Sequence, residues 1–484
     1  MKPSRQRGAA HAGGTSLSHK VRIWGVRKNL SRSKQENAKQ KKPTYTVRWN
    51  VDGVSHQSTF ATRALAEAER STLLTYANKG VAFDKVTGLP EPLLRERQAR
   101  SWYEHVCAYV DMKWSTAAGN SRRSIAETVA TVTPALVAQR GGMPDRAQIR
   151  RAMYEWVCVK TERDSNVPPA DPARVIAWLQ QNTVSLADLQ DDMTGPDLVR
   201  SALDALSLKL DGTRAARNTI TRKRAVLYNM LAYAVELRQL RQNPIDQISW
   251  KLPKAVESVD ARVVVNRQQA DRLLDAVAGQ GERGARMKAF FGCMYYAGLR
   301  PSEAVDLRRE NLVRLPESGW GDLLLTASNP RAGSAWTDSG TSRERRALKH
   351  RGRQETRSVP IHPNLAELLR AHLEQFGVHR DGRIFVGKYG GTFQETTYHA
   401  VWSKAREKAL SAAEYDSPLA GRPYDLRHAC ASTWLNAGVA PTRVAQWLGH
   451  SVEVLLRVYA KCIDGHEGAD RKRIERFMSP RAED

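Results

Sequence analysis

Apolar and polar residues alternate in the first part of the chain, and this pattern predicts a small β-sheet. Residues 45–51 place their apolar side chains on one face, and an Asp-Gly turn signal leads into a return strand over residues 54–60. Residues 21–26 form a third strand-like run. A helical pattern over residues 63–78 follows, with apolar positions suited to covering the sheet. Residues 21–85 therefore predict a three-stranded sheet backed by one helix.

Helical spacing of apolar residues dominates from residue 98 to 248 and predicts a helical domain. Pro90 and Pro92 indicate a linker before it. The clearest helix, over about 213–237, is basic in its first half and apolar in its second half. The apolar half of such a helix can pack in a bundle while its basic half contacts a phosphate backbone. A solvated charged face explains the same pattern.

A further domain is predicted from residue 263 to 484. It opens with a capping-box pattern, Asn266 with Gln269, before a run of apolar residues at helical spacing. A β insert is expected at 322–326, 346–349 and 356–361, with a Gly/Ser/Thr-rich loop over 328–342. Later helices are predicted at about 363–376, 396–409, 425–436, 442–448 and 452–459, before a polar tail with a helical run over 468–478. The fold class is therefore multidomain and mainly α.

The charge of the chain indicates what kind of partner it binds. The 484 residues carry a formal net charge of +25, and the basic residues recur in every segment, so a nucleic acid is the expected partner. Residues 1–20 are polar and basic without periodicity and are predicted to be a disordered tail. The five cysteines form no C-x-x-C pair, which fits a reducing cytoplasm, and no apolar run is long enough for a membrane.

Two arginines are expected to sit where helices begin. Arg300 follows Gly298, which is predicted to end an apolar helix, and precedes Pro301, which suits the first position of the next helix. Arg427 follows Asp425, a plausible helix cap. Backbone N–H groups at a helix start already favour an anion, and two guanidinium groups there can hold both non-bridging oxygens of one phosphate.

Three further residues complete the candidate chemistry. Glu303 lies on the same helical face as Arg300 and can hold its guanidinium in place. His450 follows Gly449, a predicted helix end, and Tyr459 ends an apolar run nine residues later. Each alone is more often structural than catalytic, so the interpretation depends on the combination.

The combined motifs resemble the tyrosine recombinase, or phage integrase, family. They are Gly-Leu-Arg-Pro-Ser-Glu ending at Glu303, Asp-Leu-Arg-His ending at His428, Leu-Gly-His-Ser ending at Ser451, and the late Tyr459. Their order and the His-to-Tyr spacing match the family. The resemblance covers residue 263 to the end; residues 98–248 resemble the family's core-binding domain, and residues 21–85 its arm-binding domain by topology alone.

The resemblance implies a role for each residue. Tyr459 would attack a DNA phosphodiester and form a 3′-phosphotyrosyl link, with Arg300, Arg427 and His450 stabilising the phosphoryl group. The family also has a lysine in a β-hairpin as general acid, and Lys349 fits best, with Arg351 and Arg353 as competitors. This chemistry requires no metal and no cofactor.

One position departs from the family pattern. The family usually has His three residues before the second arginine, and this chain has Tyr424. A phenol can donate a hydrogen bond to phosphate but is a poor base at neutral pH. His428 is expected to point elsewhere on its helix, so the sequence leaves the identity of the general base open.

The resemblance also implies partners and a setting. We expect double-stranded DNA with core-type and arm-type sites, a homotetramer on DNA, a host DNA-bending protein or excision factor, and no membrane. DNA contacts are expected from Arg22, Arg48, Arg217, Arg222 and Lys223. The expected activity is integration and excision of a mobile element or phage genome in the bacterial cytoplasm, at the nucleoid.

Two other classes of protein remain for comparison. Residues 434–448 also read as a helix-turn-helix, which is typical of a DNA-binding regulator without catalysis. Such a regulator needs neither Arg300 nor Tyr459. A metal-dependent transposase or nuclease needs a cluster of carboxylates, and the sequence has no convincing one.

Overall fold

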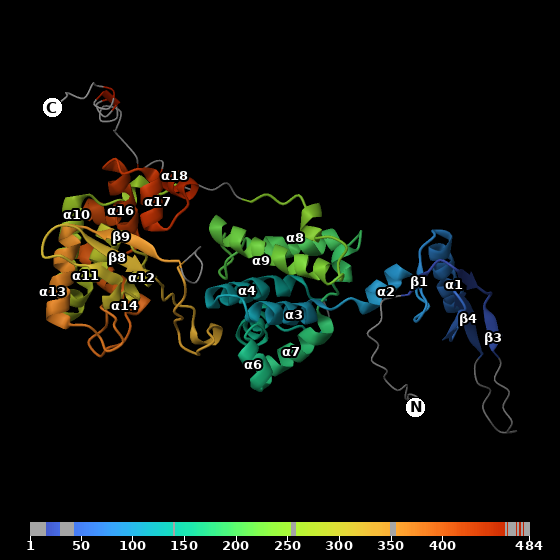
Figure 1. Ribbon diagram of the computed structural model, residues 1–484. Helices are drawn as coiled ribbons and strands as arrows, with labels where there is room; N and C mark the ends of the chain where they lie inside the picture. Colours follow the sequence, from blue (N-terminus) through green and yellow to red (C-terminus); the bar gives the residue numbers. More distant parts are fainter. Residues whose placement is uncertain are drawn as a thin grey trace. The chain divides into compact units, whose positions relative to one another are not determined.

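The part of the chain that the structure describes is mainly helical with three small sheets, and this confirms the predicted fold class (Figure 1). The computed structural model describes residues 16–29, 43–138, 141–252, 258–348 and 355–459, together with Cys462, Arg471, Ile474, Glu475 and Met478. These residues form two compact units: the described parts of Met1–Ala117 with Ser124–Leu252, and those of Ala118–Arg123 with Pro253–Asp484. The finer domain boundaries from the sequence stay predictions.

The N-terminal sheet is built around strand β4 (Thr44–Val51). Strand β5 (Val54–Phe60) pairs along one edge of β4, while β2 (Val21–Ile23) and β3 (Arg27–Asn29) pair with its two ends along the other edge. Within the described residues the sheet thus has four strands, where the sequence predicted three. The predicted strand 21–26 is interrupted because the chain leaves the ladder after Trp24, whose N–H still reaches the Arg48 carbonyl.

Helix α1 (Arg63–Asn78) begins at Thr62, whose side chain accepts a hydrogen bond from the Leu65 N–H. It has the predicted bounds and buries Ala66 and Leu73 in a small core with Val47, Trp49 and Val51 of β4. The strands β1 (Leu17–Ser18) and β6 (Phe83–Asp84), which precede and follow these elements in the sequence, form a separate antiparallel pair.

The rest of the first unit is helical, as predicted. Its helices are α2 (Glu91–Gln98), α3 (Trp102–Trp114), most of α4 (Gly119–Val132), α5 (Arg146–Ala152), α6 (Lys160–Ser165), α7 (Ala170–Asn182), α8 (Gly195–Leu206) and α9 (Arg217–Glu236). The predicted linker at Pro90 and Pro92 is in fact the start of α2, because proline is tolerated in the first turn of a helix. Helix α9 starts four residues later than predicted.

The second unit surrounds a three-stranded antiparallel sheet with helices. The strands are β7 (Leu312–Arg314), β8 (Gly321–Leu325) and β9 (Arg357–Ile361), in that order. The helices are α10 (Arg267–Ala278), α11 (Gly281–Ala297), α12 (Pro301–Val305), α13 (Pro363–Phe376), α14 (Glu395–Ala409), α15 (Ala412–Asp416), α16 (Asp425–Asn436), α17 (Pro441–Leu448) and α18 (Val452–Tyr459).

The β insert differs from its prediction in two strands. Strand β7 was missed, since three residues carry too little periodicity to read. The predicted strand 346–349 is absent from the described residues: Arg346 makes an isolated bridge with Ser328, and Lys349 lies outside them.

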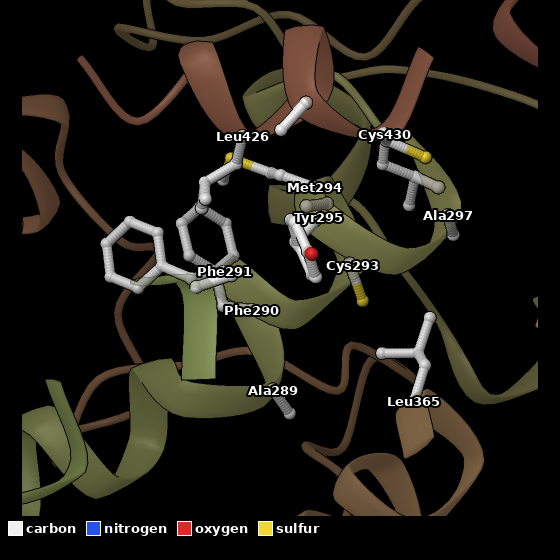
Figure 2. Packing of buried hydrophobic residues seen from close by; sticks show 14 of the residues in the cluster. Ala289, Phe290, Phe291, Cys293, Met294, Tyr295, Ala297, Leu365, Leu426 and Cys430 are labelled. Atoms are coloured by element: carbon white, nitrogen blue, oxygen red, sulfur yellow. The ribbon is translucent and has the colours of Figure 1, made fainter. Parts of the chain in front are cut away.

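Helix α11 forms the centre of the larger core. Its side chains Phe290, Phe291 and Met294 are fully buried, and Figure 2 shows them with Leu426 and Cys430 from α16. Phe290 also makes edge-to-face contacts with Phe385 and Phe393 at 5.7 Å and 5.4 Å between ring centroids. This packing fixes the C-terminal end of α11, and therefore Arg300, against α16. Among the described residues, no helix is both long and apolar enough to cross a lipid bilayer.

We predict that Phe290→Ala destabilises the second unit by about 3–5 kcal/mol, because it leaves a cavity among aromatic side chains. Urea unfolding of the full chain measures the change. Val313→Ala is the control, because Val313 is 63% exposed and its truncation should cost less than about 0.5 kcal/mol. Equal losses in both variants would contradict this view of the core.

Candidate active site

Gly298 sets the position of Arg300. It ends α11 in the left-handed conformation, with φ of +60°, and a side chain there would bring its Cβ within 2.5 Å of Leu448. Arg300 then takes extended dihedrals and precedes Pro301, the first residue of α12. The sequence predicted this arrangement from the Gly-Leu-Arg-Pro order. A helix start and a tight turn together fix the Arg300 backbone.

Glu303 is the buried centre of a cluster of charges. Its carboxylate is 2% exposed and accepts hydrogen bonds from the Arg300 backbone N–H and Nη1, both at 2.8 Å. Arg357 of β9 donates to both carboxylate oxygens, at 2.9 Å and 2.6 Å. Burial alone would raise the pKa of Glu303, but Arg357 and then Arg300 lower it to about 2. Glu303 therefore stays charged and holds two guanidinium groups.

Gly449 brings the turn before α18 against this cluster. It ends α17 with φ of +66°, and its carbonyl accepts a hydrogen bond from Arg300 Nη2 at 3.1 Å. A Cβ at this position would lie 2.7 Å from Arg357 Nη1. Only glycine allows the chain to pass this close to both arginines. The next residue, His450, is thereby placed at the edge of the cluster.

Arg427 connects the helix ends to His450. It is fully buried, and its Nη1 donates to the Gly298 carbonyl while its Nη2 donates to the Leu448 carbonyl at 2.6 Å. The same Nη2 lies 3.1 Å from His450 Nε2. A guanidinium can only donate, so Nε2 of His450 is the acceptor and a neutral ring carries its proton on Nδ1.

His450 is neutral at physiological pH. Burial lowers its pKa to about 3, and the positive charges of Arg427 and Arg300 act in the same direction. Its Nδ1 is buried and has no hydrogen-bond partner among the described residues. An N–H group left in this way is available to an acceptor that the chain alone does not provide.

Tyr459 lies at the end of α18 and is 1% exposed. Its ring stacks beside that of His450, with 6.4 Å between centroids, and its hydroxyl lies 2.9 Å from Nδ1 of His428. Burial raises the pKa of the Tyr459 phenol well above its usual value, although Arg427 opposes this. The expectation that His428 points elsewhere is therefore wrong, because α18 packs on the face of α16 that carries His428.

Tyr424 caps α16, and Asp425 is the first residue of that helix rather than its cap. Asp425 instead accepts hydrogen bonds from the Arg422 backbone N–H at 2.7 Å and from Arg422 Nη2 at 2.9 Å. The Tyr424 phenol lies beside Arg300. Burial lowers the pKa of Arg300, but Glu303 first and Tyr424 second outweigh this and raise it.

The structure brings Arg300, Glu303, Tyr424, Arg427, His450 and Tyr459 together in the second unit. Lys349 lies outside the described residues, as do its competitors Arg351 and Arg353. Sequence reasoning missed Arg357, because an arginine in a strand carries no distinguishing signal. It misjudged His428, whose position next to Arg427 was the available clue.

The expected DNA contacts lie in the first unit. Arg22 and Arg48 are exposed on β2 and β4. Arg217 begins α9, where Arg222 pairs with Glu127 at 3.0 Å and Lys223 donates to Thr131 at 3.0 Å. Lys223 is partly buried and its ammonium is already hydrogen-bonded within the helical region, and this burial lowers its pKa. Their roles in DNA binding stay predictions.

The described residues contain no group of three or more His, Cys, Asp or Glu side chains arranged for a metal.

We predict that Glu303→Gln destabilises the second unit by about 3–5 kcal/mol at neutral pH, because it leaves two buried arginines without their counter-charge. The carboxylate's stabilising effect is fully present above its ordinary pKa of 4.5 and is lost as pH falls toward about 2. The difference between variant and native chain should therefore shrink on acidification.

Urea unfolding at neutral pH and near pH 3 tests this linkage. The exposed Glu317 supplies the matched control, Glu317→Gln, which should change stability little at either pH. A Glu303→Gln penalty that does not change with pH would argue against a charged, depressed carboxyl.

Comparison with known proteins agrees with the chemistry of the site. Residues 264–465 match the phage integrase family. Tyrosine recombinase XerC of Halalkalibacterium halodurans is 24% identical over 277 residues, which cover 55% of this chain and 77% of that protein. XerC of Bradyrhizobium diazoefficiens is 27% identical over 216 residues, covering 43% and 57%.

Solved structures give a weaker likeness. The Tn1549 transposon integrase in complex with transposon right end DNA aligns with a TM-score of 0.46 at 15% identity, over 72% of this chain and 99% of that chain. The XerH site-specific recombinase bound to its difH substrate aligns with a TM-score of 0.40 at 12% identity, over 74% and 96%. Residues 264–465 are therefore a phage integrase domain of the tyrosine recombinase type, and tyrosine recombinases are DNA strand-transfer enzymes.

Proposed function

We propose that this tyrosine recombinase cleaves and rejoins double-stranded DNA through a 3′-phosphotyrosyl intermediate on Tyr459. One observation carries the proposal: the buried Tyr459 packs against His450, which is held by Arg427, beside Arg300 and its partner Glu303. Two fixed cations, a neutral histidine and a phenol suit phosphoryl transfer to a protein hydroxyl.

The two arginines stabilise the charge that develops on the phosphoryl oxygens. Their positions are fixed before the reaction by carbonyl and carboxylate acceptors, so little reorganisation is needed when the phosphate arrives. Arg300 is the more accessible of the two, with 15% of its side chain exposed. Arg427 is buried and acts through its charge and through His450.

His450 donates a hydrogen bond from Nδ1 to a phosphoryl oxygen. Two observations support this role: Nε2 is already occupied by Arg427, and Nδ1 is buried without a partner among the described residues. A histidine held in one tautomer by a donor-only neighbour can present its N–H to an anion without first gaining a proton.

The reaction conserves the number of phosphoester bonds. The Tyr459 oxygen forms a bond to phosphorus while the bond from phosphorus to the 5′ oxygen breaks, and the phenol loses its proton. We assign Lys349 as the group that gives a proton to the departing 5′ oxygen, with Arg351 and Arg353 as competitors. A second 5′-hydroxyl then reverses the step, so no nucleotide cofactor is needed.

DNA has to uncover the nucleophile. Tyr459 is 1% exposed in the chain alone, so a phosphate can reach its hydroxyl only after a shift of α18 or of the side chains that cover it. The eight residues of α18 bury Leu455 and Tyr459 and leave the others at least partly exposed. Such a short helix has few apolar contacts to lose when it moves.

The proposal extends to partners and setting. The net charge of +25 supports contact with DNA beyond the cleavage point. We assign arm-type DNA to the N-terminal sheet through Arg22 and Arg48, and core-type DNA to the helical region through Arg217, Arg222 and Lys223. The chain would act as a tetramer on two DNA sites, with a host DNA-bending protein or excision factor, integrating and excising a mobile element or phage genome in the bacterial cytoplasm.

A nicked suicide DNA substrate tests the proposal. The native chain should form a protein–DNA adduct that survives denaturant, Tyr459→Phe should form none, and cleavage should be insensitive to EDTA. Tyr389→Phe is the matched control, because Tyr389 is 94% exposed and should leave the adduct intact.

Persistence of the adduct in Tyr459→Phe would contradict the assignment of the nucleophile. If the native chain binds its own DNA site in a mobility-shift experiment but forms no adduct, it is a DNA-binding regulator. EDTA-sensitive cleavage would point to a metal-dependent nuclease.

A further inference from the structure

The hydroxyl of Tyr459 has a hydrogen-bond partner that the sequence did not predict. Nδ1 of His428 lies 2.9 Å from the Tyr459 oxygen, and the two ring centroids are 5.7 Å apart. Both groups are shielded: Tyr459 is 1% exposed and His428 is partly buried. His428 and Tyr459 come from α16 and α18, so packing of these two helices creates the contact.

Other polar groups of the candidate site are committed to different partners. His450 uses its Nε2 lone pair for Arg427, so its second nitrogen is a donor. Asp425 accepts from Arg422, and the Glu303 carboxylate is shared by two arginines. Tyr424 interacts with Arg300. Among these described groups, His428 is the one with a ring nitrogen within hydrogen-bond distance of the phenol, and that nitrogen has a lone pair when the ring proton is on Nε2.

The protonation states fit a phenol that donates and an imidazole that accepts. Burial lowers the pKa of His428 to about 4; Asp425 opposes this, whereas Arg422 and Arg427 reinforce it. His450, from the turn before α18, also lies within electrostatic range. A neutral imidazole offers one lone pair, and the protonated Tyr459 phenol can point its hydrogen at Nδ1.

We propose that His428 is the catalytic base that accepts the Tyr459 proton during cleavage and returns it during rejoining. The proposal rests on the proposed function of Tyr459. In cleavage, the O–H bond of Tyr459 breaks, its electron pair forms the bond to phosphorus, and the proton moves to His428 Nδ1. In rejoining, the 5′-hydroxyl returns its proton to the group that protonated the departing 5′ oxygen and its oxygen bonds to phosphorus. The bond from phosphorus to the Tyr459 oxygen breaks, and the phenol takes its proton back from His428.

His428 supplies the general base that is missing because Tyr424 stands in place of the family's histidine. A tyrosine in place of the family's histidine cannot act as a base at neutral pH, whereas a histidine four residues later on the same helix can. The rings of Tyr424 and His428 meet edge to face with 5.1 Å between centroids. Tyr424 therefore limits the rotation of the His428 ring, while its own hydroxyl interacts with Arg300.

Three variants of the full chain test the proposal by the rate of adduct formation on the suicide substrate. His428→Ala should slow cleavage by about 10²–10⁴-fold, the usual contribution of a general base. His428→Asn places an amide near the Nδ1 position, so it can keep the hydrogen bond but cannot take a proton; it should be equally slow. His399→Ala, on the exposed face of α14, is the control and should cleave at the native rate.

Recovery of near-native cleavage in His428→Asn would overturn the proposal, because His428 would then only position Tyr459. DNA binding by mobility shift identifies folded variants. If His428→Ala fails to bind DNA, the asparagine variant alone decides the question, since it is closer in shape and polarity to histidine.

The dependence on pH gives a second readout. A neutral His428 supports a cleavage rate that is flat between about pH 6 and about pH 9 in the native chain. Without this base the proton must leave to hydroxide, so cleavage by either His428 variant should rise about tenfold per pH unit. A flat profile in the variants would contradict the proposal.

A change of the leaving group distinguishes a general base from a general acid. A substrate with a 5′-bridging sulfur needs no proton on departure, so it should restore cleavage by Lys349→Ala but leave the defect of His428→Asn unchanged. Rescue of His428→Asn by the sulfur substrate would make His428 an acid and overturn the proposal. If the native chain forms no adduct on either substrate, it is the proposed function that fails.

Discussion

The buried carboxylate of Glu303 is the interaction on which the site depends. It joins three parts of the chain that are distant in sequence: the start of α12 through Arg300, strand β9 through Arg357, and, through these arginines, the turn at Gly449. Two buried guanidinium groups without a counter-charge would be very costly, so the carboxylate lets the fold keep cations in a dry interior. A phosphate that enters such an interior meets positive charge that water screens weakly.

The same cations determine the protonation of their neighbours. Burial and the positive charge of Arg427 keep His450 neutral, and the hydrogen bond to Arg427 selects its tautomer. The site therefore combines permanent charge on arginines with neutral groups that donate or accept single protons. His428 and Tyr459 form the second such pair, on the side of α16 that faces α18. In the proposed mechanism, charge stabilisation and proton transfer are thus carried by separate residues.

The sequence predicts most of this site, because its strongest signals are local. Gly298 and Gly449 predict helix ends, and their neighbours Arg300 and His450 are thereby placed. Arg357 could not be found in this way, since its importance arises from a partner 54 residues earlier. His428 was misjudged because adjacent residues on a helix point about 100° apart, which suggests one functional face. Both faces of α16 contribute to the candidate site: Arg427 meets the ends of α11 and α17, whereas His428 meets α18.

The central claim is that Tyr459, held by His428 beside the arginines, forms the covalent bond to DNA. Trapping the native chain on a suicide substrate, digesting the adduct and sequencing the nucleotide-bearing peptide by mass spectrometry tests it directly. The account predicts that the nucleotide is attached to Tyr459. Attachment to Tyr424, the phenol that interacts with Arg300, or to any other residue would contradict it.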